Sequence, residues 1–218
     1  MCFGNFLFTV AMVFRNSFLI NGILTNLESS YGLTLDQIEQ LERCDEQLIR
    51  TVLECPFSTP KEMLYLEMGV TPIRFSIMAR RLMFHQYILK EDDDSLIRKF
   101  YKIQSRKSVK NDWSKTVMQN LETLKISLNE NEIQNLSILS YQNIVKKAVK
   151  NLAFNHLIDL KNSHSKVMHI AYPELKMQDY VLKSTYAVEV AKFAFQCKAR
   201  MVNVGANYLF IIYIHYPL

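Results

Sequence analysis

The side chains with the most chemical potential in this sequence are Arg74, Arg81 and His85, which fall on one narrow strip of a predicted helix. Apolar stripes flank the strip on both sides, and a helix that is apolar on two sides packs against two neighbours. The three polar groups are therefore used inside the fold, and two uses stay open. They either pair with carboxylates of the acidic N-terminal third, such as Glu62 and Glu67, or line a groove that faces phosphates.

A second set of cations lies on the helix predicted over residues 137–161. Its residues Lys146, Lys147 and Lys150 gather opposite an apolar face, and no acidic residue stands at i+4 spacing to neutralise them. Such a stripe is most often a solvated surface, yet lysines without acidic partners are also free to contact a polyanion. His156, at the edge of the apolar face, is expected to be a packed, hydrogen-bonded core histidine.

The sequence contains no motif typical of metal binding or of nucleophilic catalysis. The four cysteines have no C-x-x-C or other metal-ligand spacing, and the five histidines form no H-x-x-x-H pair. The acidic run over residues 91–95 resembles polymerase carboxylates in composition, but it precedes a predicted helix, where negative charge stabilises the N-terminus. We therefore predict no catalytic residue, metal site or cofactor, and reduced thiols in an intracellular protein, nuclear or cytoplasmic.

The net charge of +5 is unevenly distributed. Residues 1–71 carry 4 basic and 9 acidic side chains, residues 72–110 carry 10 and 4, and residues 143–171 carry 5 and 1. The acidic front either complements the basic stretches within the fold or leaves a basic surface for phosphates. The candidate phosphate contacts chosen by charge placement are Arg74, Arg80, Arg81, Arg106, Lys107, Lys110, Lys146, Lys147 and Lys150.

Helix signals recur along the chain. Thr34 with Gln37, and Asn129 with Glu132, have the capping-box form, while Gly69 is placed to end one helix before Thr71-Pro72 opens the next with proline at the first helical position. We predict helices over residues 35–54, 61–68, 72–90, 95–105, 113–125, 137–161 and 184–201, with a further helix starting after residue 129.

The amino-acid composition also favours a helical fold. Of the 218 residues 49% are apolar, and only 5 Gly and 5 Pro are present, too few for the turns of an all-β sandwich. The predicted fold is all-α, an irregular multi-helix array in one or two small lobes. We divide it into an N-terminal lobe (1–105), a basic linker (106–112), a C-terminal lobe (113–201) and an apolar tail (202–218).

The two ends are apolar. Residues 3–14 lack the basic start and the cleavage site of a signal peptide, and are shorter than the 20 or so residues that span a bilayer. We expect a core helix that continues to Asn26, and a tail derived from truncation. We therefore expect no membrane partner; peripheral anchoring through either end is the third alternative.

The sequence resembles the region that follows the palm in reverse transcriptases of non-LTR (LINE-type) retrotransposons. The matching stretches, in order, are RNSFLINGILTNLESSYGLTLDQIEQLERCDEQLIRTVL, LYLEMGVTPIRFSIMARRLMFHQYIL, NDWSKTV and EVAKFAFQCKARM, within about residues 14–202. The most specific part combines Leu-Tyr-Leu-Glu, Gly69, Pro-Ile-Arg and Ala-Arg-Arg; of the candidate contacts, it contains Arg74, Arg80 and Arg81. In that family the segment is a helical thumb and linker, followed by a zinc knuckle.

The resemblance implies a non-enzymatic role, because the palm with its aspartate pair, the endonuclease and the zinc knuckle are missing from the sequence. We expect a fragment or remnant that binds RNA or DNA backbones without sequence preference, has no small-molecule substrate, and whose oligomeric state the sequence leaves open. The competing expectation is a helical structural or protein-interaction fragment without nucleic-acid affinity, in which the basic helices neutralise the acidic front.

Overall fold

The computed structural model describes residues 10, 12–25, 29, 33–53, 55, 57–106, 113–158, 172 and 174–178, and every regular element within them is a helix. The all-α prediction is thereby confirmed. Among the described residues, extended backbone pairs at an isolated antiparallel bridge between Met68 and Met177. The helices are η1 (Arg15–Ile23), α2 (Leu35–Leu53), α3 (Lys61–Met68), α4 (Ile73–Lys90), α5 (Leu96–Arg106), α6 (Trp113–Thr123), α7 (Glu130–Asn135) and α8 (Ile138–Leu157).

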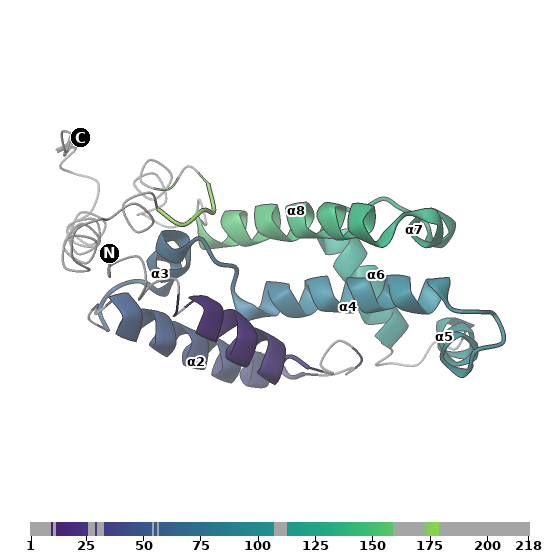
Figure 1. Ribbon diagram of the computed structural model, residues 1–218, viewed down its shortest axis with the longest axis horizontal. Coiled ribbons are helices and arrows are strands. Elements are labelled where there is room, and N and C mark those ends of the chain that lie inside the picture. Colours follow the sequence, from purple (N-terminus) through teal and green to yellow (C-terminus); the bar gives the residue numbers. More distant parts are fainter. Residues whose placement is uncertain are drawn as a thin grey trace.

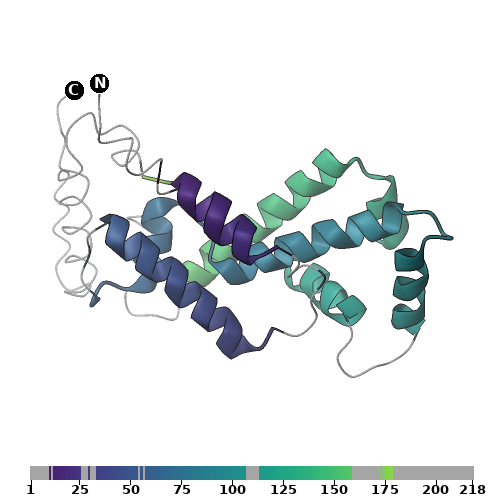
Figure 2. The ribbon, with the colours of Figure 1, turned by 60° about the horizontal axis from the view of Figure 1, so that its bottom comes forward.

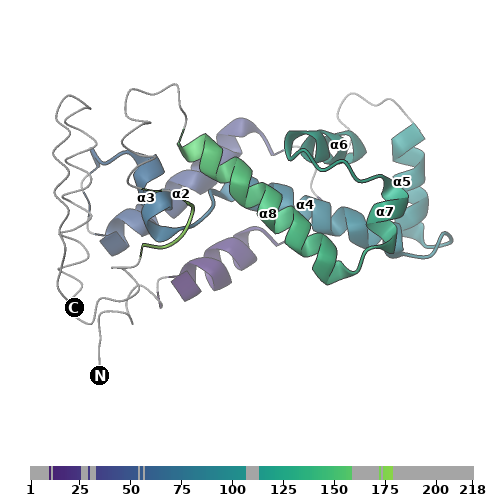
Figure 3. The same cartoon turned by 90° about the horizontal axis from the view of Figure 1, so that it is seen from above.

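Helix α4 is the centre of the array. It contacts α2, α5, α6, α7 and α8, and its most extensive partner is α8, which runs antiparallel to it (Figure 1). Seen from above, α8 crosses α4 obliquely (Figure 3). Helices α2 and α3 gather around the start of α4, and α5 and α7 around its end. Nearly all the described helices are thus positioned by one central helix.

One hydrophobic core runs through the described helices. It includes Leu53 of α2, Leu66 of α3, Leu82 of α4, Val117 of α6 and Val149 of α8, each at most 5% exposed. The core therefore passes without a break from the helices of the expected N-terminal lobe to those of the expected C-terminal one. Of the predicted linker only residue 106 is described, and it ends α5. Residues 107–112, the predicted helix 184–201 and the tail 202–218 lie outside the described residues.

Both predicted capping boxes form. The Thr34 hydroxyl accepts from the backbone N–H of Gln37 at 3.3 Å, and the Gln37 side chain accepts from the backbone N–H of Thr34 at 3.0 Å. At α7 the equivalent distances between Asn129 and Glu132 are 2.9 and 2.7 Å. Each box satisfies two N–H groups that the first helical turn leaves unpaired.

The turn between α3 and α4 also follows its sequence signals, with one correction. Gly69 ends α3 with a φ of +62°, in the left-handed region that favours glycine. Pro72, however, occupies the N-cap and not the first helical position, so α4 starts one residue later than predicted, at Ile73. The Thr71 hydroxyl does not cap the helix and instead lies 3.4 Å from the Ser76 hydroxyl.

The acidic run lies at the start of α5 as predicted, but the residue that caps the backbone is Ser95, the last of the run, and not one of the acids. The Ser95 hydroxyl accepts from the backbone N–H of Arg98 at 3.3 Å. Asp93 lies 3.6 Å from the Arg98 guanidinium and 2.6 Å from the Lys102 ammonium, and both cations hold the pKa of its carboxyl below the usual value. These contacts place negative charge at the N-terminus of the helix, where its dipole favours it.

The N-terminal helix differs from the continuous core helix expected up to Asn26. Residues 15–23 form a π-helix that lies beside α2 (Figure 2), and Val13, Phe14 and Phe18 are exposed. Leu24 packs against Ile73 and Ile77 in a small second core. Only one side of this segment is therefore buried.

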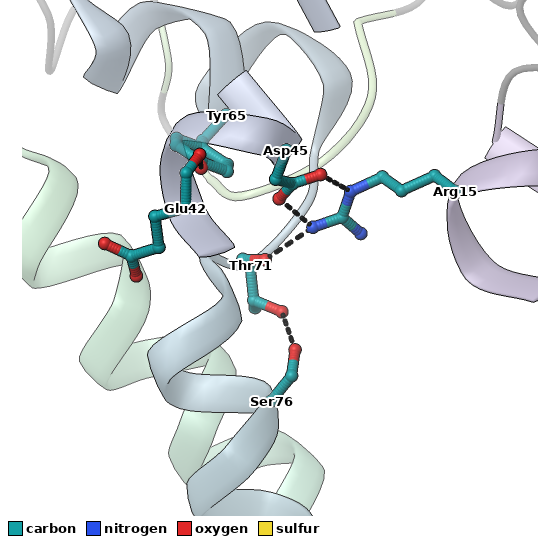
Figure 4. A network of polar contacts seen from close by, with 6 residues as sticks. All are labelled: Arg15, Glu42, Asp45, Tyr65, Thr71 and Ser76. Carbon is teal, nitrogen blue, oxygen red and sulfur yellow. Dashed lines mark hydrogen bonds and ion pairs between the residues drawn. The ribbon is translucent and has the colours of Figure 1, made fainter. Parts of the chain in front are cut away.

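The segment is held by a buried ion pair that the sequence alone did not predict. The Nε and Nη2 atoms of Arg15 donate to the two carboxylate oxygens of Asp45, both at 2.7 Å, and Nη2 also donates to the Thr71 carbonyl at 3.0 Å (Figure 4). Arg15 is 4% exposed and Asp45 is 0% exposed. This two-pronged pair joins η1, α2 and the turn that precedes α4.

Candidate nucleic-acid interface

Arg74 pairs with a carboxylate of the N-terminal third, which was the first of the two predicted alternatives. Its Nε donates to Glu42 Oε1 at 2.8 Å, its Nη2 lies 2.5 Å from Oε2, and its backbone N–H also reaches Glu42. These hydrogen bonds raise the pKa of Arg74. The predicted partners were wrong: the acid is Glu42 of α2, whereas the Glu67 carboxylate accepts from the Tyr172 hydroxyl at 2.7 Å.

Arg81 faces the interior. It is 7% exposed, and burial lowers the pKa of its guanidinium because the charged form loses hydration. A phosphate in solvent cannot reach a cation in this position without opening the helix packing. Its neighbour Arg80 is half-buried and contacts Asn21.

His85, the third group of the strip, belongs to a buried chain of hydrogen bonds between α4, α5 and α7. Its Nε2 lies 2.9 Å from the Tyr101 hydroxyl, which in turn donates to Glu130. Since the tyrosine proton is directed at Glu130, Nε2 carries the imidazole proton. Burial lowers the pKa of His85 to about 4, so the ring is neutral at physiological pH. This arrangement links three helices and leaves no open position for a substrate.

The remaining predicted phosphate contacts lie either on exposed helix surfaces or outside the described residues. Lys146, Lys147 and Lys150 are exposed on α8 and make no ion pair with any described residue. Lys147 lies in a separate hollow beside the end of α6, and Arg106 is exposed at the end of α5. Lys107 and Lys110 lie outside the described residues.

Tertiary structure brings two of the predicted contacts together at a groove between α4 and α8. The groove has a volume of about 380 Å³, and its lining contains no carboxylate. Arg80 contributes from α4 and Lys146 from α8, which packs against α4 and crosses it obliquely (Figure 3). The lining residues between these two cations are Ala79, Met83, Phe84, Gln142 and Val145.

The position of Arg80 is supported by the N-terminal helix. One of its Nη atoms donates to the side-chain oxygen of Asn21 in η1. This neutral partner orients the guanidinium but leaves its charge uncompensated. The sequence pattern named Arg80 and Lys146 separately, but nothing in their spacing indicated that they share one groove. The sequence analysis also did not identify the residues that lie between these two cations as part of a binding surface.

A second cleft, of about 230 Å³, lies between α2, the start of α3 and the end of α8. It is lined by four carboxylates, from Glu39, Glu42, Glu46 and Glu62, together with three cations, so its charges are nearly balanced. His156 is exposed at this cleft with its ring edge-on to Phe75 at 5.4 Å, which corrects the expectation of a core histidine.

The described residues contain no cluster of three or more His, Cys, Asp or Glu side chains that could hold a metal ion. None of the described helices is long and apolar enough to cross a membrane. Comparison of the chain with models of protein families, with curated proteins and with solved structures gives no match.

Proposed function

We propose that this protein is a non-catalytic remnant of a non-LTR retrotransposon reverse transcriptase, derived from the helical region behind the palm, and that it binds nucleic-acid backbones without sequence preference. The observation that carries the proposal is the groove of α4 and α8, where Arg80 and Lys146 meet without any lining carboxylate. Arg80 also lies in the part of the sequence that most closely resembles that family.

The chemistry required is that of phosphate contact. Arg80 and Lys146 supply one guanidinium and one ammonium at the groove, and Lys150 adds an ammonium one helical turn further along α8. Such contacts hold a phosphate backbone in place but carry no sequence information. The three cations come from two helices that pack against each other, so the fold brings them to one side of the α4–α8 pair.

The number of contacts predicts the salt dependence. Each phosphate contact contributes a slope of about −0.7 for single strands and −0.9 for duplex DNA to the logarithm of affinity against that of salt. Three contacts therefore predict a loss of roughly 40- to 130-fold in affinity between about 50 and 300 mM salt.

The test is fluorescence anisotropy of the purified chain with a labelled RNA–DNA hybrid and a labelled single strand. A double variant, Arg80→Gln with Lys146→Gln, is compared with Arg43→Gln with Lys115→Gln, which removes one arginine and one lysine from exposed positions outside the groove. The groove variant should bind weakly and reduce the salt slope by about 1.4 to 1.8. Equal losses in both variants would contradict the groove as the interface.

A second candidate, a helical structural or protein-interaction fragment, is favoured by the ion pairs of α2. Arg15 binds Asp45, Arg50 binds Glu46 at 2.7 Å, and Arg74 binds Glu42, so arginines of the chain itself neutralise much of the acidic front. This candidate predicts a cooperatively melting, helical protein that binds neither the hybrid nor the single strand at low salt.

A further inference from the structure

We propose that the groove of α4 and α8 selects single-stranded nucleic acid, whose bases stack on Tyr87 and Phe84 while Arg80 and Lys146 hold its phosphates. This inference rests on the proposed function and goes beyond it, because backbone contacts alone do not distinguish a single strand from a duplex.

The first argument is the order of residues along α4. Arg80, Met83, Phe84 and Tyr87 stand at i, i+3, i+4 and i+7, so they follow one another on the same side of the helix over about 10 Å. The first three line the groove, and Tyr87 continues their row beyond it. A cation is thus followed by an apolar surface and then by an aromatic ring. Surfaces that bind single strands combine these same features: cations for the phosphates and aromatic rings for the bases.

The second argument is the arrangement of the rings. The centroids of Phe84 and Tyr87 are 6.0 Å apart and their planes differ by only 17°, so the two rings present nearly parallel faces. Phe84 is held edge-on by Trp113 at 5.7 Å, which limits its movement. Tyr87 is 53% exposed in the last turn of the central helix α4, so one of the two rings is open to solvent. Two ordered rings, one of them open to solvent, form a platform on which bases can stack without sequence preference.

The third argument is the distribution of charge. The groove lining includes two cations and no acid, which suits an anionic occupant. Glu91 follows Tyr87 by one turn and raises the pKa of its hydroxyl, so negative charge begins at the far end of the platform. An incoming backbone is therefore favoured at the Arg80 end and opposed beyond Tyr87.

These features distinguish a single strand from a duplex for a simple reason. In a duplex or hybrid the bases are stacked inside, so only the phosphates can reach the groove. A single strand offers exposed base faces as well, and each base stacked on an aromatic ring strengthens binding by about 5-fold or more. The wild-type chain should therefore bind a labelled oligothymidylate at least about 5-fold more tightly than an RNA–DNA hybrid of equal length.

The deciding variant is Tyr87→Ala, with Tyr87→Phe as the conservative replacement and Phe100→Ala as the matched control. Phe100 is a 58% exposed aromatic residue on α5, outside the groove. Tyr87→Ala should weaken oligothymidylate binding by about 5-fold or more, leave hybrid binding unchanged and keep the salt slope. Tyr87→Phe should retain wild-type affinity because it keeps the ring. Thermal melts by circular dichroism check that all three variants remain folded.

The outcomes separate this inference from the proposed function. Binding that depends on Arg80 and Lys146 but is equal for both ligands, or insensitive to Tyr87→Ala, overturns the single-strand inference alone. Absence of any salt-sensitive binding overturns both. Competition by a poly-glutamate peptide as effective as that by unlabelled oligothymidylate would assign the groove to an acidic protein partner, and the single-strand inference would again be wrong.

Discussion

Replacement of Gly69 by alanine tests how the end of α3 is packed. A β-carbon at this position would lie 1.9 Å from the backbone nitrogen of Met177 and 2.3 Å from the carbonyl carbon of Lys176. Both are main-chain atoms, so no side-chain rotation relieves the clash. The segment 174–178 would have to move away from α3, where it is held by a hydrogen bond of 3.2 Å from the backbone N–H of Gln178 to the Glu67 carbonyl.

Two costs add up in the Gly69→Ala variant. The left-handed conformation, with its φ of +62°, costs an alanine about 1–2 kcal/mol more than a glycine. Loss of the hydrogen bond to Glu67 costs about another 1 kcal/mol. The free energy of unfolding should thus fall by about 2–3 kcal/mol, which for a chain of this length lowers Tm by about 5–10 °C.

The assay is urea unfolding followed by circular dichroism and by the fluorescence of Trp113, the single tryptophan of the chain. Gly22→Ala is the matched control, because a β-carbon there meets nothing within 4 Å. The control should match the wild type or gain up to about 1 kcal/mol from the better helix propensity of alanine. If Gly69→Ala unfolds at the wild-type urea concentration, the segment 174–178 does not pack on Gly69 and the reasoning is refuted.

Two further perturbations address the buried polar groups. Asp45→Leu leaves the Arg15 charge buried without its carboxylate and should cost about 3–5 kcal/mol in a thermal melt, whereas the double variant with Arg15→Met should recover most of that loss; a double variant no better than the single one would argue against the pair. Acidification should destabilise the fold through His85, since its pKa is about 4 when folded and about 6.5 when unfolded. The unfolded state then binds more protons between these values, so stability falls by about 3 kcal/mol as pH drops from 6.5 to 4. His85→Gln should flatten this part of the pH profile, and an unchanged profile would show that another group titrates.

Local signals determined most of the helix boundaries. Capping boxes at Thr34 and Asn129, and glycine at position 69, depend on hydrogen bonds and backbone angles within four residues, so the sequence alone places them correctly. At Pro72 the predicted helix start differed by one residue, because a proline suits either the N-cap or the first helical position, and α6 ends at Thr123, two residues before the predicted end.

Partners and burial were decided by tertiary structure. Periodicity placed Arg74, Arg81 and His85 on one strip, but it could not tell that the first would pair with Glu42, the second would be buried, and the third would join Tyr101. Each outcome depends on which helix arrives from far along the chain, and desolvation makes that choice decisive for a charged group.

In the candidate site, too, the sequence identified single residues and the tertiary structure decided which of them lie together. Sequence alone identified Lys146 as a cation without local acidic partners, because i,i+4 pairing is a short-range property, and it named Arg80 by charge placement and by its place in the family-like motif. Their union in one groove, with Phe84 and Tyr87 beside them, required the antiparallel packing of α4 against α8. That packing is driven by burial of apolar faces, which has no direction and so cannot be assigned to particular partners before the whole chain has folded.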